Sequence, residues 1–397
     1  MPEINPHRVG QHLRGFERAL AEYNEQEPFA RYLTRFFKEN KQMGSSDRRM
    51  TSRLCYNWFR LGHALKDMET LKRLCVAEFL CEEKSDLVAI HQPEWNNHIQ
   101  QDTEAKVAFL ASLGIDALVA IFPFTEGLSP AIDQREFALS QLQQPDLFIR
   151  VKAKEVDAVK KLLDKHDISF VQETNTCFRL ANGSRLNDVK GIAGKYEVQD
   201  FSSQRTAEFV QTEETASWWD ACAASGGKAL MLLDRYPKLN LLVSDIRLSI
   251  LRNLDERFDQ AGIPTFSYRK KVLDLTSDLS EKLGSVKFDG ILLDVPCSGS
   301  GTWGRTPEMI QQFSTAKIES FVALQKEIAA NVVTFLKPGA SLIYITCSVY
   351  EQENEGVLAY LTAQFGLVVE EVQVLQGYTQ KADSMFIARL RKSIPNA

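Results

Sequence analysis

The sequence has little of several features that would define a class of protein. Its 397 residues contain no uninterrupted apolar run near the ~20 residues that cross a bilayer. The start, "MPEINPHRVGQHLRGFERAL", lacks the apolar core and small-residue cleavage site of a secretory signal. The seven cysteines are odd in number, dispersed and never in C-x-x-C spacing, which excludes a disulfide framework and a structural zinc site. We therefore expect a soluble, cytoplasmic protein with reduced thiols, no membrane association and no metal.

Charge is unevenly distributed along the chain. The net charge is −5, yet residues 1–74 carry 14 Lys and Arg against 9 Asp and Glu, an excess of five that leaves −10 for the remainder. Basic and aromatic residues alternate in "RYLTRFFKEN" and "SSDRRMTSRLCYNWFR". Such a pattern is typical of surfaces that meet phosphates and stack on bases. It is equally typical of amphipathic helices with solvated basic faces, and both readings stay open here.

Three regions differ in their hydrophobic periodicity, as a chain longer than one core allows. Helical spacing dominates to about residue 140; Ser46 or Asp47 is a plausible N-cap for the helix that contains "RLCYNWFR". The segments "DLFIRVK", "ISFVQE" and "TCFRLA" favour strands, and "EVDAVKKLLDKHD" favours a helix. Apolar strands then alternate with helices, which predicts an α/β, doubly wound, mostly parallel sheet. We predict an all-α domain over 1–140, a small α+β module over 141–195 and a Rossmann-like domain over 196–397.

The stretch "DACAASGGK", from Asp220 to Lys228, follows a predicted strand and opens a helix. Small residues allow a close approach of the backbone, and free N–H groups at a helix N-terminus receive anions. A tight turn between strand and helix needs small residues for packing as well, so the stretch alone does not decide between the two.

Three aspartates follow successive strands of the predicted sheet: Asp245 in "VSDI", Asp274 in "VLDL" and Asp294 in "LLDVPC". Ligands of such sheets bind beyond the carboxyl ends of the strands, where an acid of the second strand commonly holds ribose hydroxyls. Each aspartate alone could cap the next element. Together with the glycine loop they indicate a ligand with ribose and base groups. The absence of G-x-G-x-x-G counts against a dinucleotide.

Two cysteines also follow strands, Cys297 in "DVPCSGSG" and Cys347 in "YITCSVYEQENE". Neighbouring strands lie ~5 Å apart, so both thiols could border one cleft. A thiolate is an effective nucleophile. The alternative is that each is a small buried apolar residue, which we expect for Cys75, Cys81 and Cys177.

The motifs "VQDFSSQ", "DACAASGGK", "DGILLDVPCSGSGTWGRTPE" and "LIYITCSVYEQENE", in this order, resemble the Sun-type RNA (cytosine-5) methyltransferases, the family that includes ribosomal small-subunit methyltransferase B. The resemblance extends from about Pro145 to the C-terminus. The N-terminal stretch looks like the NusB-like RNA-binding domain of some members, and the module between looks like the family's RNA-recognition-like domain.

This resemblance implies S-adenosylmethionine as methyl donor and RNA as substrate, with ribosomal RNA favoured over tRNA by the NusB-like start. It implies that Cys347 adds to C6 of the target cytosine, that Cys297 assists release, and that Asp294 contacts the base, with Lys228 supporting the site. It also assigns donor binding to Asp245 at the ribose, Asp274 near the adenine, Asp294, and the loop Cys222, Ala223, Ala224, Ser225, Gly226, Gly227 and Lys228. The target should be single-stranded or flipped out of its helix.

The chain departs from the family pattern at a few positions. Ser225 stands where the family usually has proline, and an arginine that the family usually carries near position 250 is not found at Ile250. Ser384 and Met385 stand where the family usually has glycine and phenylalanine. Other functions remain open: a catalytically weak RNA-binding ribosome-assembly factor, a tRNA cytosine-5 methyltransferase, or an amino-methylating enzyme. The last usually carries Asn or Asp, Pro, Pro and an aromatic residue at the fourth strand end, where this chain has "DVPC".

Overall fold

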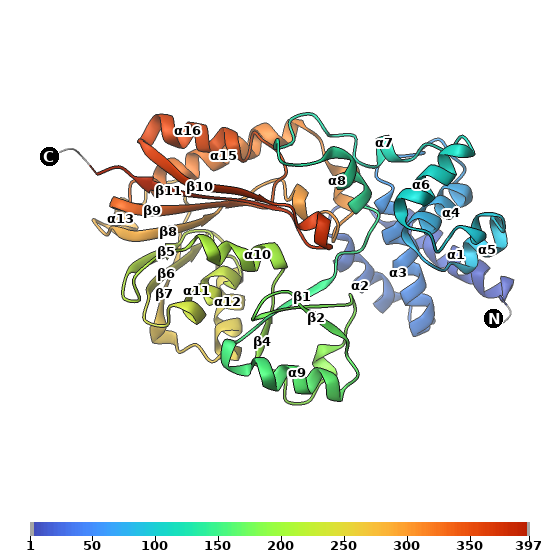
Figure 1. Cartoon of the computed structure of the whole chain (residues 1–397), viewed down its shortest axis with the longest axis horizontal. Coiled ribbons are helices and arrows are strands. Elements are labelled where there is room, and N and C mark those ends of the chain that lie inside the picture. Colours follow the sequence, from blue (N-terminus) through green and yellow to red (C-terminus); the bar gives the residue numbers. More distant parts are fainter. Residues whose placement is uncertain (1–3, 395–397) are drawn as a thin grey trace. The chain divides into compact units, whose positions relative to one another are not determined.

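The computed structural model describes residues 4–394, which form two compact units (Figure 1). The helical unit comprises the chain up to Glu126, residues 133–144 and residues 303–314. The sheet unit comprises residues 127–132, 145–302 and those from 315 onward. The predicted division at 140 and 195 stays a prediction. No helix within residues 4–394 is both long and apolar enough to span a membrane.

The helical unit confirms the predicted helical N-terminal region. Phe29, Leu33 and Phe36 form the buried stripe of one of its helices. The predicted N-cap is wrong: the cap residue is Gly44, and Ser46 and Asp47 lie inside the helix. Asp47 instead accepts a hydrogen bond from the Gly44 N–H at 3.2 Å, from the first turn. The helices are α1 (Pro6–Glu22), α2 (Phe29–Glu39), α3 (Ser45–Arg60), α4 (Thr70–Cys81), α5 (Asp86–His91), α6 (Thr103–Ser112), α7 (Leu118–Ile121), α8 (Gln134–Ser140) and α14 (Glu308–Gln312).

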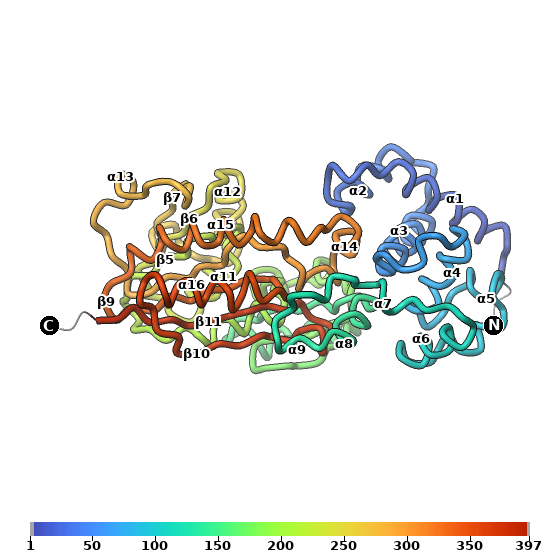
Figure 2. Tube along the Cα trace, turned by 90° about the horizontal axis from the view of Figure 1, so that it is seen from above, coloured from blue at the N-terminus to red at the C-terminus, as the bar shows by residue number. Residues whose placement is uncertain are grey.

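The helix α14 reaches this unit from far along the chain and lies beside α3 (Figure 2). Trp303, just before it, is buried against Phe122 and Phe313, with ring centroids 5.9 and 4.8 Å away. The Glu308 carboxylate accepts a hydrogen bond from the Phe29 N–H at 3.3 Å. The segment that follows the Cys297 motif is therefore part of the helical core.

Two arginines of the basic N-terminal stretch have internal partners. Arg60 is buried and donates to the carbonyl oxygens of Gln141 and Gln143, both at 2.9 Å. Arg53 forms an ion pair with Glu78, 2.5 Å apart and with Glu78 buried. These two side chains hold the helices together, so they do not contribute to a free basic surface.

A small antiparallel sheet lies in the sheet unit. Its strands are ordered β2-β3-β1-β4, with bounds β1 (Leu147–Val151), β2 (Phe170–Gln172), β3 (Cys177–Leu180) and β4 (Tyr196–Val198). The helix α9 (Val156–Lys165) buries Val159 and Leu163 in the core that this sheet shares. The predicted strands and helix are confirmed, and β4 is an addition that the sequence pattern did not indicate.

The large sheet confirms the predicted α/β, doubly wound architecture. Its strand order is β10-β11-β9-β8-β5-β6-β7, and β5 to β9 are mutually parallel while β11 runs antiparallel to both of its neighbours. The helices α15 and α16 cover one face, and α11 and α12 cover the other (Figure 1). The bounds are α10 (Phe201–Arg205), β5 (Ser217–Asp220), α11 (Gly227–Arg235), β6 (Asn240–Asp245), α12 (Leu248–Gln260), β7 (Tyr268–Val272), α13 (Ser280–Leu283), β8 (Phe288–Asp294), α15 (Ala316–Val333), β9 (Leu336–Thr346), α16 (Glu355–Phe365), β10 (Leu367–Leu375) and β11 (Met385–Lys392).

Both faces of the central strands β5, β6, β8 and β9 are buried, which explains why these strands read as apolar runs. The edge strands β7 and β10 are mostly exposed. Trp219, Leu293 and Tyr344 point into one core. Trp218 and Leu292, each one position earlier, point into the other. Because these strands are parallel and in register, their carboxyl ends lie together at one end of the sheet.

Candidate active site

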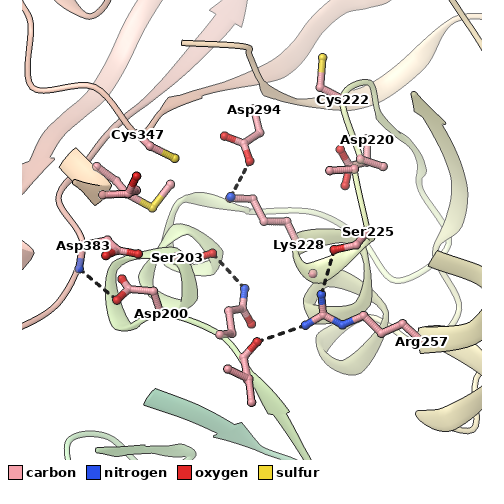
Figure 3. A pocket seen from close by; sticks show the side chains of 17 residues that line it. Asp200, Ser203, Asp220, Cys222, Ser225, Lys228, Arg257, Asp294, Cys347 and Asp383 are labelled. Atoms are coloured by element: carbon pink, nitrogen blue, oxygen red, sulfur yellow. Dashed lines mark hydrogen bonds and ion pairs between the residues drawn. The ribbon is translucent and has the colours of Figure 1, made fainter. Parts of the chain in front are cut away.

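A cavity of about 300 Å³ opens at the carboxyl ends of the parallel strands (Figure 3). The strands β5, β6 and β8 end at Asp220, Asp245 and Asp294, and Cys347 directly follows β9. The cavity is lined by Val198, Gln199, Asp200, Ser203, Asp220, Cys222, Ala223, Ala224, Ser225, Gly227, Lys228, Arg257, Asp294, Thr302, Cys347, Asp383 and Met385. Most of the residues predicted from the motifs therefore meet at one place.

The glycine loop passes under this cavity in a conformation that needs its small residues. Ala224 and Gly226 both have positive φ, 47° and 81°. A Cβ on Gly226 would lie 2.7 Å from side-chain atoms of Leu254 and Phe258 on α12, so a larger residue cannot enter without moving that helix. The helix α11 starts at Gly227 with no side-chain cap among the described residues. Its first N–H groups are therefore available to an anion in the cavity.

Lys228 and Asp294 form an ion pair of 2.6 Å at the centre of the cavity (Figure 3). Burial lowers the pKa of the Lys228 ammonium, but Asp294 and the other acidic groups outweigh burial and leave the pKa above its ordinary value. Lys228 is thus a permanent positive charge between the glycine loop and the end of β8.

The two cysteines that follow strands are neighbours. The Cys347 N–H donates a hydrogen bond to the Cys297 sulfur at 3.3 Å. A hydrogen bond to Cys297, burial and the charge of Asp294 raise the pKa of the Cys347 thiol well above its ordinary value, while Lys228 opposes them. These effects keep Cys347 a neutral thiol, and any added positive charge near it favours the thiolate.

Asp220 presents an unusual carboxyl group to the cavity. The residue is 1% exposed, and neither of its oxygens has a hydrogen-bond partner among residues 4–394. Burial, with Asp294 adding to it, raises the pKa of Asp220 to about 8 from 3.8. A buried polar group without a partner is a marker of a missing cation or hydrogen-bond donor.

Four predicted site residues lie outside the cavity lining: Gly226, Asp245, Asp274 and Cys297. The Asp245 carboxylate accepts from the N–H of Arg247 at 2.9 Å and from its guanidinium at 3.1 Å. The Asp274 carboxylate accepts from the Thr276 N–H at 3.0 Å and its hydroxyl at 2.7 Å, which is the turn-capping alternative. The donor-binding roles of these two aspartates stay predictions.

Several cavity residues were not assigned from the sequence. Gln199, Asp200 and Ser203 belong to "VQDFSSQ", a motif that carried the resemblance but received no role. Asp220 ends a strand as Asp294 does, so the same rule would have found it. Arg257 gave no local signal: its Nη1 donates to the Ser225 hydroxyl at 3.4 Å from the far end of α12, while its Nε is held by Glu197 at 2.8 Å.

Among the thiols expected to be buried, Cys75 and Cys177 are buried and Cys81 is only partly buried. Burial raises the pKa of Cys75, Cys81 and Cys177 to about 12 in each case. Nowhere in the described part of the chain do three His, Cys, Asp or Glu side chains gather as metal ligands do.

Comparison with known proteins finds a family model that matches most of the large sheet. Residues 207–391 match the family model described as 16S rRNA methyltransferase RsmB/F. A ribosomal RNA small subunit methyltransferase B from Xylella fastidiosa is 33% identical over 214 residues, which are 51% of this chain and 50% of that protein. The chain spans about half the length of the curated relatives that it matches.

Two solved structures share the fold. The crystal structure of PH0851 has a TM-score of 0.71 at 19% identity and covers 96% of this chain and 98% of its own. The structure of NSun6 from Pyrococcus horikoshii with SFG has a TM-score of 0.57 at 17% identity and covers 63% of this chain and 91% of its own. The Rossmann-like architecture is therefore found in known proteins, and the Sun-type resemblance of the motifs is confirmed by the family match.

Proposed function

We propose that this chain, whose residues 207–391 belong to the RsmB/F methyltransferase family, is an S-adenosylmethionine-dependent RNA (cytosine-5) methyltransferase that acts on ribosomal RNA. The observation that carries the proposal is the meeting of two cysteines and the Lys228–Asp294 ion pair at the carboxyl ends of adjacent strands. Ribosomal RNA is favoured by the names of the curated relatives.

The cavity fits the methionine portion of the donor. The donor's α-ammonium matches the Asp220 carboxylate, whose oxygens have no partner among residues 4–394, because a cation within reach offsets the cost of burying that carboxylate. The donor's carboxylate matches the uncapped backbone N–H groups at the start of α11 and the nearby Arg257 guanidinium. When bound, the donor supplies an electrophilic methyl group and a positive sulfonium. Asp245 and Asp274 are proposed to hold the ribose and the adenine.

The chain's own groups supply the remaining chemistry. Cytosine C5 is a weak nucleophile, so Cys347 first loses its thiol proton to solvent. Its sulfur then bonds to C6 while the C5–C6 π bond opens and leaves an electron pair at C5. Lys228 favours the thiolate that this addition needs, and Asp294 contacts the cytosine edge and supports its protonation. After C5 has taken the methyl group, it must lose its proton and the bond between sulfur and C6 must break. We assign assistance in these last events to Cys297, which lies beside Cys347.

The substrate base must leave its helix to reach this site. The cavity lies at the carboxyl ends of the strands, and stacking covers the two ring faces of a paired cytosine, from which a thiolate must approach C6. We therefore expect the target cytosine to be single-stranded or flipped out.

Covalent trapping tests the proposal. RNA that carries 5-fluorocytosine cannot lose its C5 substituent as a proton, so the enzyme should remain attached in the presence of donor. We expect the unaltered protein to form this adduct, Cys347→Ala to form none, and Cys297→Ala to accumulate an adduct even with ordinary ribosomal RNA. The opposite behaviour of the two variants would show that the assignment of the cysteines is wrong.

A second measurement identifies the target. Bisulfite sequencing of total RNA from cells with and without the gene should reveal one missing 5-methylcytosine in ribosomal RNA. Loss of a methylcytosine from tRNA instead would contradict the substrate, and absence of any change together with no adduct would contradict the activity.

A further inference from the structure

A buried carboxylate joins the two cysteine loops. Glu353 is fully buried, and its Oε1 accepts from the Ser298 N–H at 2.8 Å and from the Gln325 amide at 2.9 Å. Its Oε2 accepts from the Ser298 hydroxyl at 2.6 Å and the Ser348 hydroxyl at 2.5 Å. Four donors on one carboxylate is close to all that its lone pairs accept.

Two of these hydrogen-bond donors lie directly beside the cysteines in the chain. Ser298 directly follows Cys297, and Ser348 directly follows Cys347. The Glu353 carboxylate therefore accepts hydrogen bonds from the residue that follows each cysteine. Up to the strand ends the spacing is set by the parallel ladder, whose last bond runs from the Val295 N–H to the Ile345 carbonyl oxygen at 3.1 Å. Beyond that point the Gly301 N–H donates to the Cys347 carbonyl oxygen at 2.8 Å, and Glu353 accepts from the residue next to each cysteine.

Glu353 is itself held in place by elements on either side. Gln325 of α15 also donates to the Pro296 carbonyl oxygen at 2.9 Å, so the same amide supports the Cys297 loop. The Tyr344 hydroxyl donates to the Glu353 carbonyl oxygen at 2.8 Å. The carboxylate is thus a fixed reference point rather than a mobile surface group.

A carboxylate is required there by its hydrogen-bonding chemistry. All four groups that face it are donors, and no Lys or Arg of the described chain forms an ion pair with it. A glutamine of the same size would place N–H groups against donors and lose acceptor sites. Glu353 therefore does not serve as the counter-charge of a lysine or arginine, and its role lies in the four hydrogen bonds that it accepts.

We propose that Glu353 is a positioning residue that sets the distance between Cys297 and Cys347. The inference rests on the proposed function, because the two thiols must reach adjacent ring atoms of one cytosine, C6 and C5. Glu353 does not line the donor cavity. Its loss should consequently separate the thiols without weakening donor binding.

The test compares Glu353→Gln with Glu351→Gln, an exposed glutamate two positions earlier. Hydrogen exchange measured by mass spectrometry should rise at least ~10-fold for the peptides with Ser298 and Cys347 in Glu353→Gln only. Calorimetric Kd values for S-adenosylhomocysteine should agree within about threefold among all three proteins. With ribosomal RNA, kcat of Glu353→Gln should fall ~10²-fold at unchanged KM, since a displacement of about 1 Å costs that much.

The outcomes separate the two proposals. Unchanged exchange in Glu353→Gln, or turnover within threefold of Glu351→Gln, would overturn the positioning role. If even the unaltered protein forms neither adduct nor methylcytosine, the proposed function fails, and the exchange data still decide whether Glu353 joins the loops. Should Glu353→Gln not fold, Ser298→Ala removes one donor from the same carboxylate, and it must show faster exchange at Cys297 with an unchanged Kd.

Discussion

Replacing Asp220 with asparagine should make the protein without donor more stable and its donor binding weaker. The carboxyl group is buried at the end of β5, and neither oxygen finds a partner within residues 4–394. Asparagine has nearly the same shape and cannot ionise. The substitution therefore isolates the free energy of holding an ionisable group at this buried position.

The magnitude follows from the pKa, which burial raises to about 8 from 3.8. Each pKa unit is worth about 1.36 kcal/mol, so ionising Asp220 in the folded protein costs ~6 kcal/mol more than in the unfolded chain. Below about pH 4 the group is protonated in both states and costs nothing. As the pH rises toward 8 only the unfolded chain gains by ionising, and the unfolding free energy falls by about 1.4 kcal/mol per pH unit.

Urea unfolding of both proteins between pH 5 and 8.5 measures this effect. The unfolding free energy of Asp220→Asn minus that of the unaltered protein should grow by about 1.4 kcal/mol per pH unit and level off above 8. A buried amide without a partner lowers the variant's stability by about 1–3 kcal/mol, but this penalty does not depend on pH. A difference that stays constant across the range would refute the reasoning.

Donor binding supplies the complementary measurement. An ammonium group that pairs with Asp220 favours its ionised form, so binding at pH 7 should release roughly nine-tenths of a proton, given a pKa of about 8. Calorimetry in buffers with different ionisation enthalpies detects this proton. Asp220→Asn should release none and bind S-adenosylhomocysteine ~10 to 100-fold more weakly, the loss expected for a charged hydrogen bond. Equal proton release by both proteins would contradict the role of Asp220.

Two further substitutions test the glycine loop and its support. Gly226→Ala should destabilise the protein by ~2–5 kcal/mol, from the left-handed backbone and the contact with α12, whereas Gly262→Ala, also at positive φ but with open space around it, should cost only ~1–2 kcal/mol in urea unfolding. Equal losses would show that the contact with α12 is not limiting. Arg257→Met should weaken binding of S-adenosylhomocysteine ~10-fold by calorimetry, and the exposed Arg252→Met should leave it unchanged; a weaker Kd in both would point to net charge instead.

Residues at strand ends were the most predictable part of the site. Asp294 and Cys347 follow long apolar runs, and the rule that ligands bind beyond the carboxyl ends of parallel strands places both at one edge. The same rule applies to Asp220, but this residue also begins the glycine loop and was therefore given no role of its own. Asp274 shows the limit of the rule, because an aspartate in a turn also satisfies backbone N–H groups locally.

Helix boundaries were less predictable. Gly44 caps α3, and Asp47 reaches back to it from the first turn. A cap and an acid three positions later satisfy the same free N–H groups, so the sequence contains both without showing which one begins the helix.

The sequence by itself determined the fold class, the glycine loop, the strand-end acids and the pair of cysteines, because these depend on periodicity and short motifs within one or two elements. Only the tertiary structure decided contacts between residues far apart in the chain. It brought Arg257 to Ser225, placed Trp303 in the helical unit, and joined both cysteine loops through Glu353. It also left the oxygens of Asp220 without a partner in the described part of the chain. Such contacts arise from the packing of whole elements, and the local sequence does not predict which side chain will fill a given space.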